Sequence, residues 1–202
     1  MKAAGIATQT KRIGEKDMES MLRTYRMQKG EPPYIGVVHR LDQPVKGVMA
    51  FAKTKEAAAD LSRQVAAKMA DKFYYAMVDG MPEKEKDILE DYLLRDGKTN
   101  TSKVVAKETV DAKRAELSYE VLETDGKRSI LKIKLGTGRH HQIRVQLSNA
   151  GWPIVGDRKY NLKEIAAAAQ DELALCSYKI GFMHPKTRRK MEFEIDRPFH
   201  LT

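Results

Sequence analysis

The segment ELSYEVLETDGKRSILKIKL, residues 116–135, decides the fold class. Apolar side chains occupy alternate positions in both of its halves: Leu117, Tyr119 and Val121, then Leu131, Ile133 and Leu135. Alternation with a period of two is typical of a β-strand that buries one face. Asp125-Gly126 separates the halves and is a common turn pair in β-hairpins. The segment therefore predicts two antiparallel strands joined by a tight turn.

Helices and further strands are expected on both sides of this hairpin. Helices are expected at residues 14–29, 55–70 and 140–149, with Thr54 capping the second. Strands are expected at residues 34–39, 47–53, 72–79, 173–183 and 190–195. The polar stretch 83–114 is expected to be an exposed excursion or short edge strands. The order predicts a single α+β domain with a mixed, largely antiparallel sheet and flanking helices.

Charge and composition narrow the class of protein. A net charge of +9 attracts the phosphates of nucleic acids, although a basic chain can also owe its charge to solubility alone. No apolar run reaches the roughly 20 residues that cross a bilayer, and the N-terminus lacks the apolar centre of a secretory signal. Cys176 is the single cysteine, which excludes an intrachain disulfide. We therefore expect a cytoplasmic location.

The sequence His39-Arg40-Leu41-Asp42 lies in the loop between two predicted strands. A neighbouring arginine favours the ionised form of an aspartate, and an ionised, positioned carboxylate can act as nucleophile or general base. Taken alone, the same residues also fit an ordinary surface turn with an Arg–Asp pair.

Two further segments have residue types suited to nucleic acid. In KFYYAMVDG, residues 72–80, Tyr74 could stack on a base or be a half-buried sheet residue. In GTGRHHQIRV, residues 136–145, a glycine-rich turn before a helix is expected to present free N–H groups to an anion, reinforced by Arg139 and Arg144. Adjacent histidines in a helix point about 100° apart, so no metal site is predicted there.

Two later segments read as turns. Residues 151–160, GWPIVGDRKY, contain two glycines and a proline, with Arg158 and Lys159 as candidate phosphate contacts. Residues 182–187, FMHPKT, receive no chemical role.

In this order and spacing, the five motifs resemble the RluA-type pseudouridine synthases over about residues 2–198. Residues 2–6, KAAGI, are similar to a K-P-A-G-I/L segment of that family, with Ala3 in place of proline. The strand that usually precedes this segment, and an S4-type RNA-binding domain, are not recognised in the sequence. The resemblance implies the pseudouridine synthase fold with a central active-site cleft, no cofactor and no metal. It also implies a stem-loop of rRNA or tRNA as partner, and we expect a monomer without an obligate protein partner.

The resemblance also implies a role for individual residues. Asp42 would be the catalytic carboxylate, Arg144 would pair with it, and Tyr74 would stack on the target base. Arg40 would displace or replace the flipped uridine. Residues assigned to RNA or substrate binding are His39, Arg40, Lys46, Gly138, Arg139, His141, Gln142 and Arg158. Lys46 stands in Val45-Lys46-Gly47, where family members often have Thr-Ser-Gly.

The implied reaction breaks the bond between uracil N1 and C1′ and joins C5 to C1′. Asp42 could attack C1′ or remove the C2′ proton, and the sequence leaves both routes open. It also leaves open a catalytically silent RNA-binding module and, with less support, a nucleosidase. The nucleosidase alternative has less support because no second carboxylate stands at a position that would suggest such a reaction.

Overall fold

The computed structural model describes residues 1–12, 14–166 and 172–201. The chain divides into two compact units, each built from segments distant in sequence. Unit 1 comprises Met1–Lys72 and Ser177–Asp196, and unit 2 comprises Phe73–Cys176 and Arg197–Thr202. Among the described residues, none of the helices combines the length and the apolar character that a transmembrane span requires. That the two units form one catalytic domain stays a prediction.

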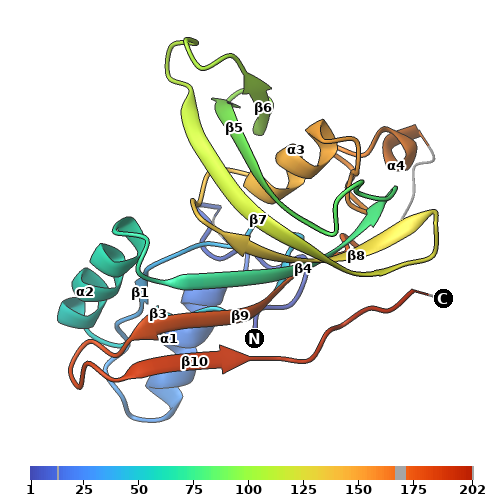
Figure 1. The fold of residues 1–202 in the computed structure, drawn as a ribbon. Helices are drawn as coiled ribbons and strands as arrows, with labels where there is room; N and C mark the ends of the chain where they lie inside the picture. Colours follow the sequence, from blue (N-terminus) through green and yellow to red (C-terminus); the bar gives the residue numbers. More distant parts are fainter. Residues whose placement is uncertain (13, 167–171, 202) are drawn as a thin grey trace. The chain divides into compact units, whose positions relative to one another are not determined.

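Unit 1 combines two helices with short strands. Its elements are α1 (Met18–Gln28), β1 (Gly36–Val37), β2 (Lys46–Gly47), β3 (Phe51–Ala52), α2 (Lys55–Ala66), most of β9 (Leu175–Met183) and β10 (Lys190–Glu194). β1 pairs with β3 and β9 with β10, both antiparallel, and β2 pairs with β9. α2 packs against β1 and β3 (Figure 1).

The two helices of unit 1 were predicted, but α1 starts later than expected and α2 ends at Ala66 rather than at residue 70. α1 begins at Met18 rather than at residue 14, because the Asp17 side chain accepts the Ser20 N–H at 2.7 Å and Ser20 Oγ accepts the Asp17 N–H at 3.2 Å. This reciprocal cap satisfies donors that the first helical turn leaves free. α2 begins after Thr54 as predicted, with Thr54 Oγ1 accepting the Ala57 N–H at 3.2 Å.

The strands predicted at 34–39 and 47–53 are much shorter than expected. β1 and β3 contain two residues each. Between them, backbone groups bond to partners outside this ladder; the Val48 N–H, for example, donates to Ser177 O at 2.7 Å. The apolar pattern correctly indicated burial, but it could not indicate which backbone groups supply the hydrogen bonds.

Unit 2 is built on antiparallel strands in the order β4-β8-β7-β5-β6. Its elements are most of β4 (Asp71–Asp79), β5 (Lys86–Asp96), β6 (Thr101–Val105), β7 (Lys113–Thr124), β8 (Arg128–Leu135), α3 (Gln142–Asn149) and α4 (Leu162–Ala166). Figure 1 shows β7 and β8 as the long predicted hairpin, and α3 packs against β5 and β6. α4 was not predicted. The α+β class with a largely antiparallel sheet is confirmed, and the central cleft stays a prediction.

The stretch 83–114 is more regular than expected. β5 extends over eleven residues and lies between β7 and β6, so both of its edges form ladders. Its polar composition is compatible with a strand because one face is exposed, as Ile88 and Glu90 show. The expectation of short edge strands therefore holds only for β6.

Alternating side chains of the central hairpin form the core of unit 2. Leu117, Leu131 and Ile133 are fully buried, and Tyr119 is 4% exposed. Burying one such side chain stabilises the fold by about 1.5–3 kcal/mol. The register between β7 and β8 shifts between Val121 and Glu123, where the alternation of burial ends.

Candidate active site

In unit 1, Asp42 lies in a loop that the N-terminal segment holds from one side. The Gly5 N–H donates to Gln43 O and the Gln43 side chain donates back to Gly5 O, each at 2.9 Å. Thr8 Oγ1 donates to Leu41 O at 3.0 Å and accepts the Leu41 N–H at 3.2 Å. Both residues that flank Asp42 are therefore tied to residues 5–8, which restricts the backbone that carries the carboxylate.

Lys2 supplies a buried positive charge beneath the same loop. Its ammonium donates to Gln43 O at 2.9 Å and to Val45 O at 2.6 Å, and the residue is fully buried. Burial lowers the pKa of Lys2 to about 8, and the negative charge of Asp42 partly opposes that shift. Lys2 thus orders the carbonyls around Asp42 and interacts electrostatically with its carboxylate.

The other predicted residues of unit 1 lie on or beside this loop. His39 Nε2 accepts the Ala50 N–H at 3.0 Å, which closes the loop just beyond the β1–β3 ladder. Arg40 is exposed, and Lys46 is half-buried in β2. Gly47 has φ +136°, and a Cβ there would collide with the backbone of Ser177, so only glycine fits at this position.

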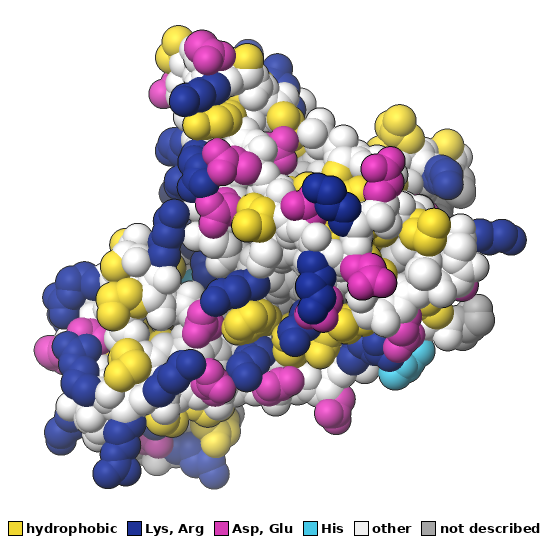
Figure 2. All heavy atoms as spheres, viewed as in Figure 1, with side chains coloured by type: hydrophobic (Ala, Val, Ile, Leu, Met, Phe, Trp, Pro, Cys, Tyr) yellow, Lys and Arg dark blue, Asp and Glu magenta, His cyan; other side chains and the backbone are white. Residues whose placement is uncertain are grey.

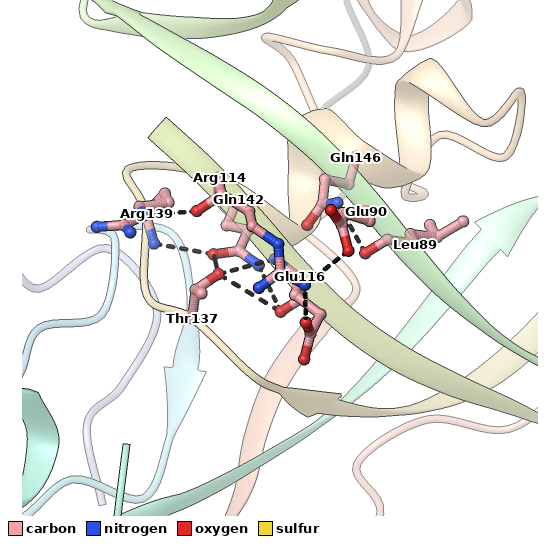
Figure 3. Close-up of polar contacts among 8 residues, drawn as sticks. All are labelled: Leu89, Glu90, Arg114, Glu116, Thr137, Arg139, Gln142 and Gln146. Carbon is pink, nitrogen blue, oxygen red and sulfur yellow. Dashed lines mark hydrogen bonds and ion pairs between the residues drawn. The ribbon is translucent and has the colours of Figure 1, made fainter. Parts of the chain in front are cut away.

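In unit 2, the turn before α3 is organised around the buried side chain of Gln142 (Figure 3). Gln142 Oε1 accepts from Thr137 Oγ1 at 2.7 Å and from the Arg139 N–H at 2.9 Å, and Nε2 donates to Glu116 O at 3.0 Å. Arg139 Nε donates to Arg114 O at 2.9 Å. Gln142 therefore shapes the turn on which Arg139 and the exposed Gly138 are presented.

The expectation that this turn offers free N–H groups to an anion is wrong for four of its residues. The N–H groups of Gly136 and Thr137 both donate to Glu116 O, at 3.0 and 3.1 Å. The Arg139 N–H donates to Gln142 Oε1, and the Gln142 N–H donates to Arg139 O at 3.2 Å. A backbone carbonyl about twenty residues away, Glu116 O, and a side chain three residues ahead, Gln142 Oε1, thus satisfy donors that the local motif leaves open.

The two histidines do not point apart as expected. α3 begins at Gln142, not at residue 140, and His141 has a left-handed φ of 52°. The rings of His140 and His141 consequently stack, with centroids 3.8 Å apart, instead of pointing apart. His141 Nδ1 lies 2.8 Å from Tyr160 Oη, and burial together with the charge of Arg144 holds the pKa of His141 far below its usual range.

Arg144 forms a buried two-point ion pair with Asp157, a partner that the sequence did not suggest. Arg144 Nε and Nη2 donate to the two carboxylate oxygens at 2.8 and 2.7 Å. The side chains are 4% and 0% exposed, and the guanidinium carbon lies 5.2 Å from the ring centre of Tyr160. Asp157 thereby fixes the orientation of Arg144, while the pairing of Arg144 with Asp42 stays a prediction.

Tyr74 and Arg158 differ in exposure. Tyr74 lies in β4 opposite Ile133 and is 6% exposed, so little of its ring is open to solvent. Arg158 is exposed in the connection after α3. Base stacking by Tyr74 and phosphate contact by Arg158 both stay predictions.

A cavity of about 920 Å³ lies elsewhere in unit 2, near the start of α4. Its lining includes Asp79, Arg128, Asn161 and Glu164, and none of the predicted site residues lines it. Because Arg128 Nε and Asn161 Nδ2 both donate to Asp79, at 3.3 and 2.8 Å, much of its polar surface is already paired. The cavity therefore gives no support to an alternative site.

Sequence reasoning missed three kinds of supporting residue: Lys2 and Thr8 beneath the Asp42 loop, Thr137 and Glu116 at the turn, and Asp157 with Tyr160 beside Arg144. Lys2 and Asp157 lie in segments already singled out, so that signal was present. Thr8 and Glu116 carry no local signal, because their partners are 33 and 26 residues away.

Comparison with known proteins identifies the family of the chain. A family model described as RNA pseudouridylate synthase matches residues 1–149. An uncharacterised RNA pseudouridine synthase of Aquifex aeolicus is 36% identical over 171 residues, covering 81% of this chain and 53% of the relative. The dual-specificity RNA pseudouridine synthase RluA of Vibrio parahaemolyticus is 36% identical over 167 residues, covering 80% and 65%. The chain spans about half the length of most of the curated relatives it matches.

Solved structures show the same fold. Human RNA pseudouridylate synthase domain containing 1 superposes with a TM-score of 0.80 at 24% identity, covering 98% of this chain and 79% of that one. Human RNA pseudouridylate synthase domain containing 4 gives a TM-score of 0.78 at 22% identity, covering 98% and 84%. The family match over residues 1–149, supported by these relatives, shows that the chain belongs to the RNA pseudouridylate synthase family.

Proposed function

We propose that this protein converts uridine to pseudouridine in a structured RNA, a stem-loop of rRNA or tRNA, with Asp42 as the catalytic carboxylate. The observation that carries the proposal is the support of Asp42: the residues on both sides of it are hydrogen-bonded to the N-terminal segment, above the buried ammonium of Lys2. A surface turn would not require a buried charge beneath it. A rigidly held carboxylate is what nucleophilic or general-base chemistry requires.

The remaining residues of the proposal assist this carboxylate. Asp157 holds Arg144, and we propose that Arg144 would supply a further positive charge to Asp42. The ionised carboxylate is the reactive form on either route. Tyr74 would stack on the uracil once the uridine leaves its helix, a step that costs a few kcal/mol. Arg40, which is exposed, would occupy the space that the uridine leaves. We further propose that the protein acts as a cytoplasmic monomer and needs no cofactor.

Mapping of the product tests the proposal. Incubation with tRNA and rRNA transcripts, followed by carbodiimide modification and primer extension, is expected to reveal new pseudouridines with the wild-type protein and none with Asp42→Asn. Asp111→Asn is the matched control, since it removes a negative charge from an exposed turn of unit 2, and it is expected to retain activity. RNA binding by the wild type without product would support a silent RNA-binding module instead, and release of free uracil would support a hydrolase.

A further inference from the structure

The positive charge of the chain is concentrated in one of the two units. Unit 1 contains nineteen Lys and Arg against eleven Asp and Glu, whereas unit 2 contains eighteen against seventeen. Unit 1 therefore carries eight of the nine net positive charges although it is the smaller unit. A polyanion that contacts this protein is attracted mainly to unit 1.

Five of these nineteen basic side chains lie together on one surface, which we call the α2 surface. It comprises Arg63 on α2, Lys68 just after it, and Lys186, Arg188 and Arg189 of the β9–β10 turn. All five side chains are exposed. Figure 2 shows Lys and Arg side chains gathered where Figure 1 draws α2 and this turn, at the left and lower left.

Two buried side chains of α2 hold the turn in place. Gln64 Nε2 donates to Met183 O and Gln64 Oε1 accepts the Met183 N–H, both at 2.8 Å. Asp60 accepts from Gln64 at 2.7 Å and from both Arg63 and Arg188, each at about 3.1 Å. α2 and the β9–β10 turn are thus joined by two hydrogen bonds between the Gln64 side chain and the Met183 backbone. The Asp60 carboxylate also contacts arginines of both elements. These hydrogen bonds fix the basic side chains of α2 and of the turn relative to each other.

The charge of the α2 surface is largely uncompensated. Across the parts of the chain that the structure describes, no carboxylate forms an ion pair with Lys68, Lys186 or Arg189. Asp60 balances only one of its two arginines, whose side chains stay 73% and 61% exposed. Like charges held close together repel each other, and binding of an anionic partner would relieve this repulsion.

We propose that the α2 surface binds the sugar–phosphate backbone of RNA, independently of base sequence. The charges are spread over two elements and do not converge on one point, which suits a chain of phosphates better than a single anion. Membrane-surface helices require an exposed apolar face. No large apolar side chain of α2 is exposed, and the exposed Met69 beside Lys68 is a single residue rather than a face. The choice of RNA as the polyanion rests on the proposed function.

Salt-dependent binding tests this surface directly. The variant K68Q/K186Q/R189Q is compared with wild type by fluorescence anisotropy, using a labelled RNA stem-loop without uridine and unfractionated tRNA. Each lost phosphate contact reduces the slope of log K against log salt by roughly 0.7–0.9. We expect the slope to fall by about 2 and the affinity near 0.1 M salt to drop roughly 10- to 100-fold for both RNAs.

The matched control is K98Q/K107Q/K127Q, which removes three exposed positive charges from unit 2 and is expected to keep most of the wild-type slope. The charge-preserving variant K68R/K186R/R189K is expected to keep it fully, which separates loss of charge from loss of structure. An unchanged slope in the glutamine variant overturns the proposal, as does an equal loss in the unit 2 control. If the glutamine variant loses binding to phosphatidylserine vesicles but binds RNA as the wild type does, the α2 surface contacts a membrane instead.

This test is separate from the test of catalysis. If the wild-type protein forms no pseudouridine, the proposed function fails, but the comparison of salt slopes still decides whether the α2 surface binds RNA. If pseudouridine forms and the slopes are equal, the proposed function stands and the α2 surface is not its RNA contact.

Discussion

At the scale of single residues, His39 shows how burial selects a protonation state. Its Nε2 accepts the Ala50 N–H, so that nitrogen carries no proton in the folded protein. Its Nδ1 is buried and has no hydrogen-bond partner among the described residues. Burial, reinforced by the positive charge of Lys72, lowers the pKa of His39 from 6.5 to about 4. The imidazole therefore stays neutral at physiological pH and serves to close the Asp42 loop.

This pKa predicts acid sensitivity. Between pH 6.5 and 4 the unfolded chain protonates His39 while the folded chain does not. The contribution of neutral His39 to the free energy of unfolding, which is present above pH 6.5, is therefore lost as the pH falls toward 4. The loss is at most about 3 kcal/mol, from 1.36 kcal/mol per pKa unit. Urea unfolding of wild type and His39→Gln across this range is expected to show a steeper pH dependence for wild type, because glutamine can accept the same N–H without titrating. Parallel pH profiles would contradict the assignment.

At the scale of elements, one buried carboxylate joins α3 to the connection that follows it. Asp157 accepts from Arg144 on α3 and from the N–H groups of Lys159 and Tyr160, at 2.9 and 3.2 Å. α3 has no local side-chain cap at its start, since His141 makes no capping hydrogen bond. Long-range contacts, not helix propensity, therefore account for the position of this short helix.

Removing the charge of Asp157 is expected to destabilise the protein strongly. Asp157→Asn keeps the shape but leaves a buried guanidinium without its main counter-charge, which costs on the order of 3 kcal/mol. Urea unfolding measures the change, with Asp111→Asn as a control that removes an exposed charge and is expected to have a small effect. A loss for Asp157→Asn no larger than that of the control would mean that the ion pair contributes little.

The elements also show where prediction succeeded. The 116–135 hairpin and α2 were predicted because alternation, a turn pair and a capping threonine act over a few residues. The start of α3 and the extent of β1 and β3 were wrong because their ends depend on distant partners, such as Gln142 with Glu116 and Val48 with Ser177.

At the scale of the whole molecule, the net charge of +9 predicts that RNA binding depends on salt from the first encounter. Screening shortens the reach of the field from about 30 Å at 0.01 M salt to about 8 Å at 0.15 M. The association rate constant for RNA, measured by stopped-flow fluorescence, is expected to fall at least about tenfold between 0.05 and 0.5 M salt. A constant rate over this range would show that the charge does not guide the encounter.

The sequence by itself determined the fold class, the family and the loop that presents Asp42, because periodicity and ordered motifs are properties of neighbouring residues. Only the tertiary structure decided which residues hold the Asp42 loop and Arg144 in place. Arg26 looks like a surface residue of α1, yet it is buried and donates to Tyr34 O and Lys53 O. Lys2 and Asp157 likewise became visible as buried charges only once their partners were placed. A buried charge is stable only with partners around it, and those partners come from parts of the chain that only folding brings together.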